Sequence, residues 1–311
     1  MASYKKKFAG KHVVITGGSE GIGLALAKLF VEAHANVTIV SRSASKLEAA
    51  RSDLETSAQK CSSASLVNVQ SADVTSYEQI SKGLENAKVA LGAIDVLVCN
   101  AGTSTPGYIH EHGVDVFQQQ INLNYMGAVN TVKAAYDSMV TRNSGHICIV
   151  SSTLGLMAFV GYAAYCGSKY AVRGFAEALR NELCGSEVTV SIMFPPDTAT
   201  PGYEQENKIK PKEATEISAG AIEVSPEAVA RCMIKGIAGG RFMLGNPDLG
   251  LAIHQRAVAG MTPRRFPGIL LDMLLGLFAP IVHMIFSKSM DNTSKKNAQT
   301  RFKKLWASDS K

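Results

Sequence analysis

A tyrosine and a lysine in the stretch YCGSK have the types and the spacing of an acid–base pair. Tyr165 and Lys169 are four residues apart, so on a helix they lie on one face. A neighbouring ammonium group favours the phenolate and lowers the tyrosine pKa toward the working range of a general acid or base. Ser152 ends an apolar stretch thirteen positions before Tyr165, where its hydroxyl can meet the phenol. Tyr–Lys pairs at this spacing are often surface pairs. The hypothesis of an acid–base site therefore depends on the combination of this pair with Ser152.

A glycine-rich turn points to a second chemistry, the binding of a diphosphate. Gly17, Gly21 and Gly23 lie in TGGSEGIG, between a strand-like apolar stretch and a helical pattern. Glycine lets the backbone turn tightly and approach a diphosphate, and the N-terminus of the helix adds a favourable dipole. An ordinary tight turn is the alternative, but the strand–turn–helix context favours a dinucleotide site.

The end of the second predicted strand indicates which dinucleotide is bound. An acidic residue there would bind the ribose 2′-hydroxyl of NAD. The chain instead has Ser41 and Arg42, with Lys46 one helical turn further on. Cations at this point suit a 2′-phosphate, so the pattern favours NADP(H) over NAD(H). The alternative is that Arg42 is a solvated cation at the start of a helix.

The elements that must position these groups are strands alternating with helices. Short β-branched stretches precede longer helical patterns, which predicts one doubly wound (Rossmann) α/β fold with helices on both faces of a parallel sheet of about seven strands. Ligands bind such sheets at the carboxyl ends of the strands. We predict a catalytic domain over residues 1–245. The predicted strands are HVVIT, NVTIVS, SLVNVQSADV, IDVLVCNAG, GHICIVSS, VTVSIMFPP and RFMLG.

Composition and charge narrow the function classes. The chain has 46% hydrophobic residues and a formal net charge of +6, with basic residues concentrated near both ends. Its six cysteines form no CxxC pair, which is typical of a reducing compartment. His110 and His112 have no third ligand nearby, so no metal site is predicted. No basic patch is interleaved with aromatic residues, so we expect no nucleic-acid partner.

Taken together and in order, these motifs resemble the short-chain dehydrogenase/reductase family over roughly residues 10–245. NAG at 100–102 and NYMG at 124–127 complete the match. The resemblance implies a catalytic tetrad of Asn124, Ser152, Tyr165 and Lys169. Tyr165 would give a proton to a carbonyl oxygen that Ser152 holds, while nicotinamide delivers hydride. Lys169 would hold the ribose and lower the tyrosine pKa, and Asn124 would fix a proton-relay water.

The resemblance also implies which residues bind the cofactor, NADPH. Asp73 matches the position that contacts the adenine. Ser151 is adjacent to Ser152, and the spacing to Tyr165 favours Ser152 as the catalytic hydroxyl. The full expected set is Gly17, Ser19, Glu20, Gly21, Ile22, Gly23, Arg42, Lys46, Asp73, Val74, Asn100, Ala101, Gly102, Tyr165, Lys169, Pro195, Thr198 and Thr200.

The stretch FPPDTATPGYEQENKIKP, residues 194–211, departs from the usual family pattern. Pro196 replaces a glycine, and proline fixes φ and removes an N–H. The nicotinamide carboxamide contacts are then expected from residues 197–198. The stretch resembles the variant in 3-ketodihydrosphingosine (3-dehydrosphinganine) reductases, which implies a substrate lid near 197–222. Asp197 and Glu204 are the candidate ligands for the ammonium group of a long-chain keto base.

The C-terminal extension, residues 246–311, contains the apolar run 266–286. It is marginally long enough to span a bilayer and carries Pro280, with Arg264 and Arg265 before it and Lys288 after it. Flanking cations suit a segment set in or on an anionic membrane, in a re-entrant or in-plane position. A soluble dimerisation helix is the alternative, which leaves a homo-oligomer open.

We therefore expect a membrane-associated, NADPH-dependent reductase of 3-oxosphinganine, giving sphinganine. The resemblance implies the endoplasmic reticulum membrane, with the catalytic domain facing the cytosol. One alternative is the reduction of another lipid ketone, such as a steroid, retinal or a 3-ketoacyl compound. A catalytically idle dinucleotide-sensing scaffold is a second alternative, and the intact tetrad argues against it.

Overall fold

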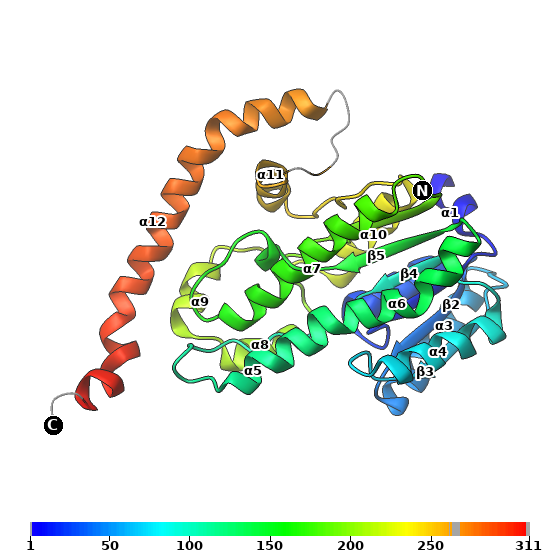
Figure 1. Cartoon of the computed structure of the whole chain (residues 1–311), viewed down its shortest axis with the longest axis horizontal. Coiled ribbons are helices and arrows are strands. Elements are labelled where there is room, and N and C mark those ends of the chain that lie inside the picture. The colour runs from blue at the N-terminus through cyan, green and yellow to red at the C-terminus, as the bar shows by residue number, and fades with distance from the viewer. Residues whose placement is uncertain (1, 261, 263–267, 309–311) are drawn as a thin grey trace.

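A parallel sheet lies at the centre of the structure, a computed structural model that describes residues 2–260, 262 and 268–308. The sheet has six strands in the order β3-β2-β1-β4-β5-β6 (Figure 1). All of the paired strands are parallel, and their carboxyl ends lie along one edge. The strands are β1 (His12–Thr16), β2 (Asn36–Ser41), β3 (Val67–Ser71), β4 (Val96–Cys99), β5 (Gly145–Val150) and β6 (Val188–Met193).

The predicted seventh strand is reduced to a single bridge. Ile192 of β6 pairs in parallel with Met243, and its backbone bonds to Phe242 and Leu244. The following residues turn away, because the Asn246 side chain donates to the Phe194 carbonyl at 2.9 Å. The doubly wound fold was thus predicted correctly, but the sheet has six strands rather than about seven.

Helices cover both faces of the sheet and bury an apolar core on each. Phe30, Leu54 and Met233 are fully buried on one face, and Leu84, Met139 and Leu179 pack on the other. Burial of each such side chain stabilises the fold by about 1.5–3 kcal/mol. The first face is covered by α1 (Ala2–Phe8), α2 (Gly21–Glu32), α3 (Ala44–Lys60) and α10 (Pro226–Ala238), and the second by α4 (Tyr77–Leu91), α6 (Gly127–Thr141) and α7 (Ala163–Glu182).

The helices of the predicted lid and of the C-terminal extension lie outside this three-layer arrangement. The predicted lid contains α8 (Pro201–Ile209) and α9 (Lys212–Ser218). Helix α11 (Leu249–Ala257) is fastened to the catalytic domain, because the Gln255 side chain donates to the Leu244 carbonyl at 2.8 Å. The long helix α12 (Gly268–Ser308) follows and extends along one side of the molecule, away from the sheet (Figure 1).

Candidate active site

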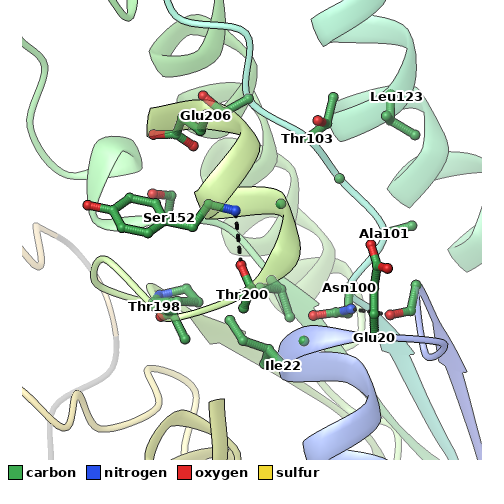
Figure 2. Close-up of a pocket in the computed structure, with 18 of the residues that line it drawn as sticks. Glu20, Ile22, Asn100, Ala101, Thr103, Leu123, Ser152, Thr198, Thr200 and Glu206 are labelled. Atoms are coloured by element: carbon green, nitrogen blue, oxygen red, sulfur yellow. Dashed lines mark hydrogen bonds between the residues drawn. The ribbon is translucent and has the colours of Figure 1, made fainter. Parts of the chain in front are cut away.

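A cavity of about 400 Å³ opens at the carboxyl edge of the sheet. It lies where the strand order reverses between β1 and β4, the position at which doubly wound folds bind ligands. Its walls come from the turn after β1, the ends of β2, β4 and β5, the start of α7, and α8 of the lid. Figure 2 shows Thr198 and Thr200 between Ile22 of the glycine-rich turn and Ser152.

Tyr165 and Lys169 both line this cavity from one face of α7. The Lys169 Nζ lies 5.6 Å from the centroid of the Tyr165 ring and donates to the Val150 carbonyl at 3.2 Å. Lys169 is almost completely buried, and this burial lowers its pKa to about 8. The spacing in the sequence therefore does bring the ammonium group beside the phenol.

The pKa of Tyr165 differs from the prediction. Its burial in the pocket wall raises the pKa above the ordinary value, and the negative charge of Glu206 raises it further. A hydrogen bond with Ser152 lowers the pKa, but by less. The pKa is thus raised on balance and not lowered as predicted, because desolvation outweighs the groups that favour the phenolate. The phenol is consequently held in its protonated form.

The two neighbouring serines have different partners. The buried Ser151 hydroxyl donates to the Lys169 carbonyl at 2.9 Å, which fastens β5 to α7. The Ser152 hydroxyl accepts from the Leu154 N–H at 3.1 Å, at the start of the short helix η2 (Thr153–Gly155), and lies beside Tyr165. The geometry is consistent with Ser152 as the hydroxyl that faces a substrate, which stays a prediction.

Asn124 lies in the π-helical segment η1 (Ile121–Met126), which continues α5 (Val114–Gln120) into α6. Such segments inside helices occur frequently at functional sites. The Asn124 amide accepts from the Thr103 N–H at 2.9 Å and donates to the Thr103 carbonyl and the Ser168 hydroxyl, each also at 2.9 Å. Its side chain therefore joins the loop after β4 to α7, while its predicted role with a relay water stays a prediction.

The glycine-rich turn has no room for a side chain at two of its glycines. Gly17 has φ +65°, and a Cβ on Gly23 would lie 2.3 Å from the Gly17 carbonyl oxygen. The Asn100 amide donates to the Thr16 and Gly17 carbonyls at 3.1 and 3.0 Å. Because β1 and β4 are neighbours, this contact holds the turn open at the cavity edge. A nicotinamide dinucleotide fits these residues, since any side chain at Gly17 or Gly23 would fill the turn.

Some of the predicted cofactor residues lie elsewhere. Lys46 forms an ion pair with Glu20 at 2.6 Å and does not line the cavity, whereas the exposed Arg42 does. The Asp73 carboxylate accepts from the N–H and hydroxyl of Thr75, so it is used in its own turn and lies outside the cavity. The remaining predicted residues line the cavity, apart from Gly23: Gly17, Ser19, Glu20, Gly21, Ile22, Arg42, Val74, Asn100, Ala101, Gly102, Tyr165, Lys169, Pro195, Thr198 and Thr200.

The lid contributes one predicted and one unpredicted acid. Asp197 lines the cavity and accepts from the Tyr203 hydroxyl at 2.8 Å. Glu204 is exposed and does not line it, because Thr200 caps α8 and sets a helical phase that turns Glu204 outward. Glu206 lines the cavity instead. The i,i+3 spacing of Tyr203 and Glu206 on one face of a helix was the signal in the sequence that could have found it.

The apolar run forms the first half of α12. Residues 264–267, which include the predicted flanking pair Arg264 and Arg265, lie outside the described residues. Between 268 and 298 the helix is long and apolar enough to cross a membrane, because it contains an 18-residue window with a mean hydropathy of 2.2, and none of that window is buried. Pro280 lies within the helix without ending it. The second half of the helix contacts the lid, where Arg301 forms an ion pair with Glu213 of α9.

The cysteines form no disulfides, and the two histidines of the HEH stretch pack against aromatic rings. All six cysteines are free. The His110 ring stacks on Tyr108, with the centroids 5.5 Å apart, and His112 meets the edge of Phe117. Across the described part of the chain, no three potential metal ligands of these types or of acidic type come together.

Comparisons with known proteins agree with this geometry. The family described as short chain dehydrogenase matches residues 11–210. A 3-ketodihydrosphingosine reductase of Dictyostelium discoideum is 36% identical over 91% of this chain and 87% of its own. A 3-dehydrosphinganine reductase of Danio rerio is 39% identical over 76% and 71%. The crystal structure of levodione reductase shares the fold, with a TM-score of 0.71, 19% identity and coverage of 79% and 98%. The chain thus belongs to the short-chain dehydrogenase/reductase family and is an oxidoreductase that uses a nicotinamide dinucleotide.

Proposed function

We propose that the protein reduces 3-oxosphinganine to sphinganine with NADPH, in the synthesis of sphingolipids. The observation that carries the proposal is the meeting of Tyr165, Lys169 and Ser152 at the cavity where the glycine-rich turn also lies. The names of the relatives support the substrate, since several similar proteins are 3-ketodihydrosphingosine reductases. The exposed apolar half of α12 supports a lipid substrate that is taken from a membrane.

The protein's own groups account for the proton side of this reduction. When bound, the nicotinamide supplies a hydride to the carbonyl carbon. Tyr165 donates its proton to the carbonyl oxygen, and its raised pKa keeps it protonated beforehand. The Lys169 ammonium stabilises the phenolate that forms, and a pKa of about 8 leaves it mostly charged at neutral pH. Ser152 orients the oxygen by a hydrogen bond, so that one hydride and one proton add across the C=O bond.

Turnover of a panel of lipid ketones by the purified protein tests the proposed reaction. With NADPH in excess, 3-oxosphinganine is expected to have a higher kcat/KM than a steroid ketone, retinal or a 3-ketoacyl thioester. A preference for one of the other ketones would assign the site to a different lipid. Binding of NADPH without turnover of any of them would favour the dinucleotide-sensing scaffold.

The preference for NADPH is proposed to depend on Arg42, which lines the cavity at the end of β2. Arg42→Asp is expected to shift the ratio of kcat/KM for NADPH to that for NADH by about ten- to a hundredfold toward NADH, because a charge-assisted hydrogen bond to the 2′-phosphate becomes a repulsion. Arg51→Asp is the matched control, since it makes the same change of charge in α3, where Arg51 pairs with Glu55 and does not line the cavity. If the ratio of kcat/KM for NADPH to that for NADH were equal in the wild type and Arg42→Asp, Arg42 would be only a solvated cation at the start of a helix.

The C-terminal extension, residues 246–311, is proposed to hold the enzyme on the cytosolic face of the endoplasmic reticulum membrane. Leu277 and Phe278 are 72% and 58% exposed, although the exposure of large apolar side chains to water is unfavourable. Side chains of α11 hold the apolar half of α12 along its length: Arg256 bonds to the Gly268 carbonyl at 2.9 Å and to Asp272 at 2.7 Å, and His254 bonds to His283 at 3.2 Å. A stretch held at both of its ends against α11 supports an in-plane segment more than a single perpendicular span.

Deletion of residues 266–311 is expected to release the protein from membranes, with a far larger loss of activity on the long-chain ketone than on a short, soluble keto-amine. Fractionation with an alkaline carbonate wash and paired assays measure this. The double variant Leu277→Glu/Phe278→Glu separates membrane binding from the contacts of the second half of α12, which it leaves in place. Sedimentation of the truncated protein with membranes would place the anchor elsewhere.

A further inference from the structure

Glu206 is an acidic side chain in the catalytic cavity to which the proposed reaction gives no task. It comes from α8 of the lid and lines the same cavity as Tyr165. Its carboxylate accepts from the Tyr162 hydroxyl at 2.6 Å, and the Tyr162 and Tyr165 rings lie 6.2 Å apart. In Figure 2 it lies at the end of the cavity away from Glu20 and Ile22 of the glycine-rich turn. Glu206 therefore bonds to the tyrosine that neighbours the proton donor, at the end of the cavity opposite the glycine-rich turn.

The charge on Glu206 is incompletely balanced by the protein. Among the described residues, no lysine, arginine or histidine forms an ion pair with its carboxylate. Lys210, whose positive charge lowers the pKa of Glu206, instead donates to the Tyr203 hydroxyl at 3.2 Å and lies over that ring at 4.6 Å. Burial raises the pKa of Glu206, as expected for a carboxylate withdrawn from water. A carboxylate in this position is complementary to a cation that arrives with the substrate.

Asp197, the other acid in the cavity, is less suited to that task. Its carboxylate accepts from the Tyr203 hydroxyl at 2.8 Å, and that hydroxyl also receives the Lys210 ammonium. Asp197 thus lies in a network that already contains a cation, whereas Glu206 is bonded to a neutral phenol. The difference in partners distinguishes the two acids.

We infer that Glu206 is the specificity-determining residue that binds the ammonium group on the carbon next to the substrate ketone. The inference rests on the proposed function, because it takes a 2-amino ketone as the substrate. The ketone oxygen must contact Tyr165 in order to receive its proton. The ammonium group on the adjacent carbon is then expected within reach of Glu206, which lines the same cavity. Ketones of similar length without the amine would leave the carboxylate without a counter-ion.

The same contact would assist proton transfer. The negative charge of Glu206 raises the pKa of Tyr165 and so opposes formation of the phenolate. An ammonium group bound to Glu206 cancels that charge next to the phenol. A substrate that carries the amine therefore removes a barrier to its own reduction, whereas a substrate without it does not.

Substitution of Glu206 by glutamine, assayed with two ketones, tests the inference. Glu206→Gln keeps an acceptor for the Tyr162 hydroxyl and removes only the charge. The two ketones are 3-oxosphinganine and its des-amino analogue of equal chain length, presented in the same detergent. We expect the ratio of their kcat/KM values to fall about 10- to 100-fold in Glu206→Gln, the range of a lost charge-assisted hydrogen bond. The thermal midpoint and NADPH affinity of the variant show that it is folded.

Glu204→Gln is the matched control, because it removes the same charge from the solvent side of the same helix. Its substrate ratio is expected to equal that of the wild type. If Glu206→Gln lowered kcat/KM equally for both ketones, the inference would be overturned. Glu206 would then only help to position α8. A ratio that falls as much in Glu204→Gln would also overturn it, as a general charge effect. A wild-type enzyme that reduced neither ketone with NADPH would overturn the proposed function itself, and the inference with it.

Discussion

Replacement of Tyr165 by phenylalanine is expected to lower kcat by about 10²- to 10⁴-fold, the usual loss when one acid–base group is removed. The variant keeps the ring and its packing against Tyr162, whose centroid lies 6.2 Å away. NADPH binding should change little, because Lys169 and the glycine-rich turn are untouched. Single-turnover reduction of 3-oxosphinganine and titration of NADPH by fluorescence measure the two effects separately.

Tyr170→Phe is the control for this experiment. Tyr170 lies on the same helix, but its side chain is exposed and does not line the cavity. Loss of its hydroxyl should leave kcat unchanged. If Tyr165→Phe retained more than about a tenth of the wild-type kcat, another group would have to protonate the ketone. Tyr165 would then be a wall of the cavity and not its acid.

The sequence was sufficient to predict the fold wherever one local pattern decides the element. Short β-branched stretches such as HVVIT and GHICIV are buried strands, as predicted. The stretch RFMLG has a strand's composition but pairs through Met243 alone. Its pairing ends because Asn246 bonds to the Phe194 carbonyl, a contact between residues 52 positions apart. A pattern confined to five residues cannot contain that information.

In the candidate site, too, features set by local spacing could be predicted, whereas features set by tertiary contacts could not. Tyr165 and Lys169 were predictable because four residues of one helix fix their relation. Lys46 was assigned to the cofactor by its place along the chain, but in the structure it pairs at 2.6 Å with Glu20, just before α2, and lies outside the cavity. The direction of the Tyr165 pKa also depends on surroundings, since burial and Glu206 outweigh the groups that were visible in the motif. Local spacing thus predicts which groups meet, and tertiary contacts decide what each of them does.

A buried ion pair between the tail and the lid is a further feature that depends on distant parts of the chain. Arg301 of α12 lies 3.0 Å from Glu213 of α9, and their side chains are only 13% and 1% exposed. The Tyr108 hydroxyl donates to the same carboxylate, and the Arg301 guanidinium lies 5.8 Å from the centroid of the Tyr108 ring. The pair therefore connects α12 to the lid and to the loop after β4.

Arg301→Met is expected to destabilise this contact by about 3–5 kcal/mol, because it leaves the buried Glu213 carboxylate without its partner. The effect should be local. Hydrogen exchange of the amides of α9 and of the second half of α12 should accelerate, while the strands of the sheet keep their protection. A less ordered lid should also raise KM for the lipid ketone and leave NADPH binding unchanged. Exchange measured by mass spectrometry and steady-state kinetics give both results.

Lys212→Met is the matched control, because Lys212 and Glu216 form an ion pair on the same helix at 3.8 Å with the lysine 72% exposed. An exposed pair contributes only about 0.2–1 kcal/mol, so exchange of α9 should hardly change. Glu213→Gln combined with Arg301→Met removes the unpaired charge and should restore much of the protection that Arg301→Met alone loses. Equal, small effects of Arg301→Met and Lys212→Met would mean that the tail does not hold the lid. Coupling between α12 and the catalytic domain would then depend on its other contacts, such as those of Arg256 and His254 on α11.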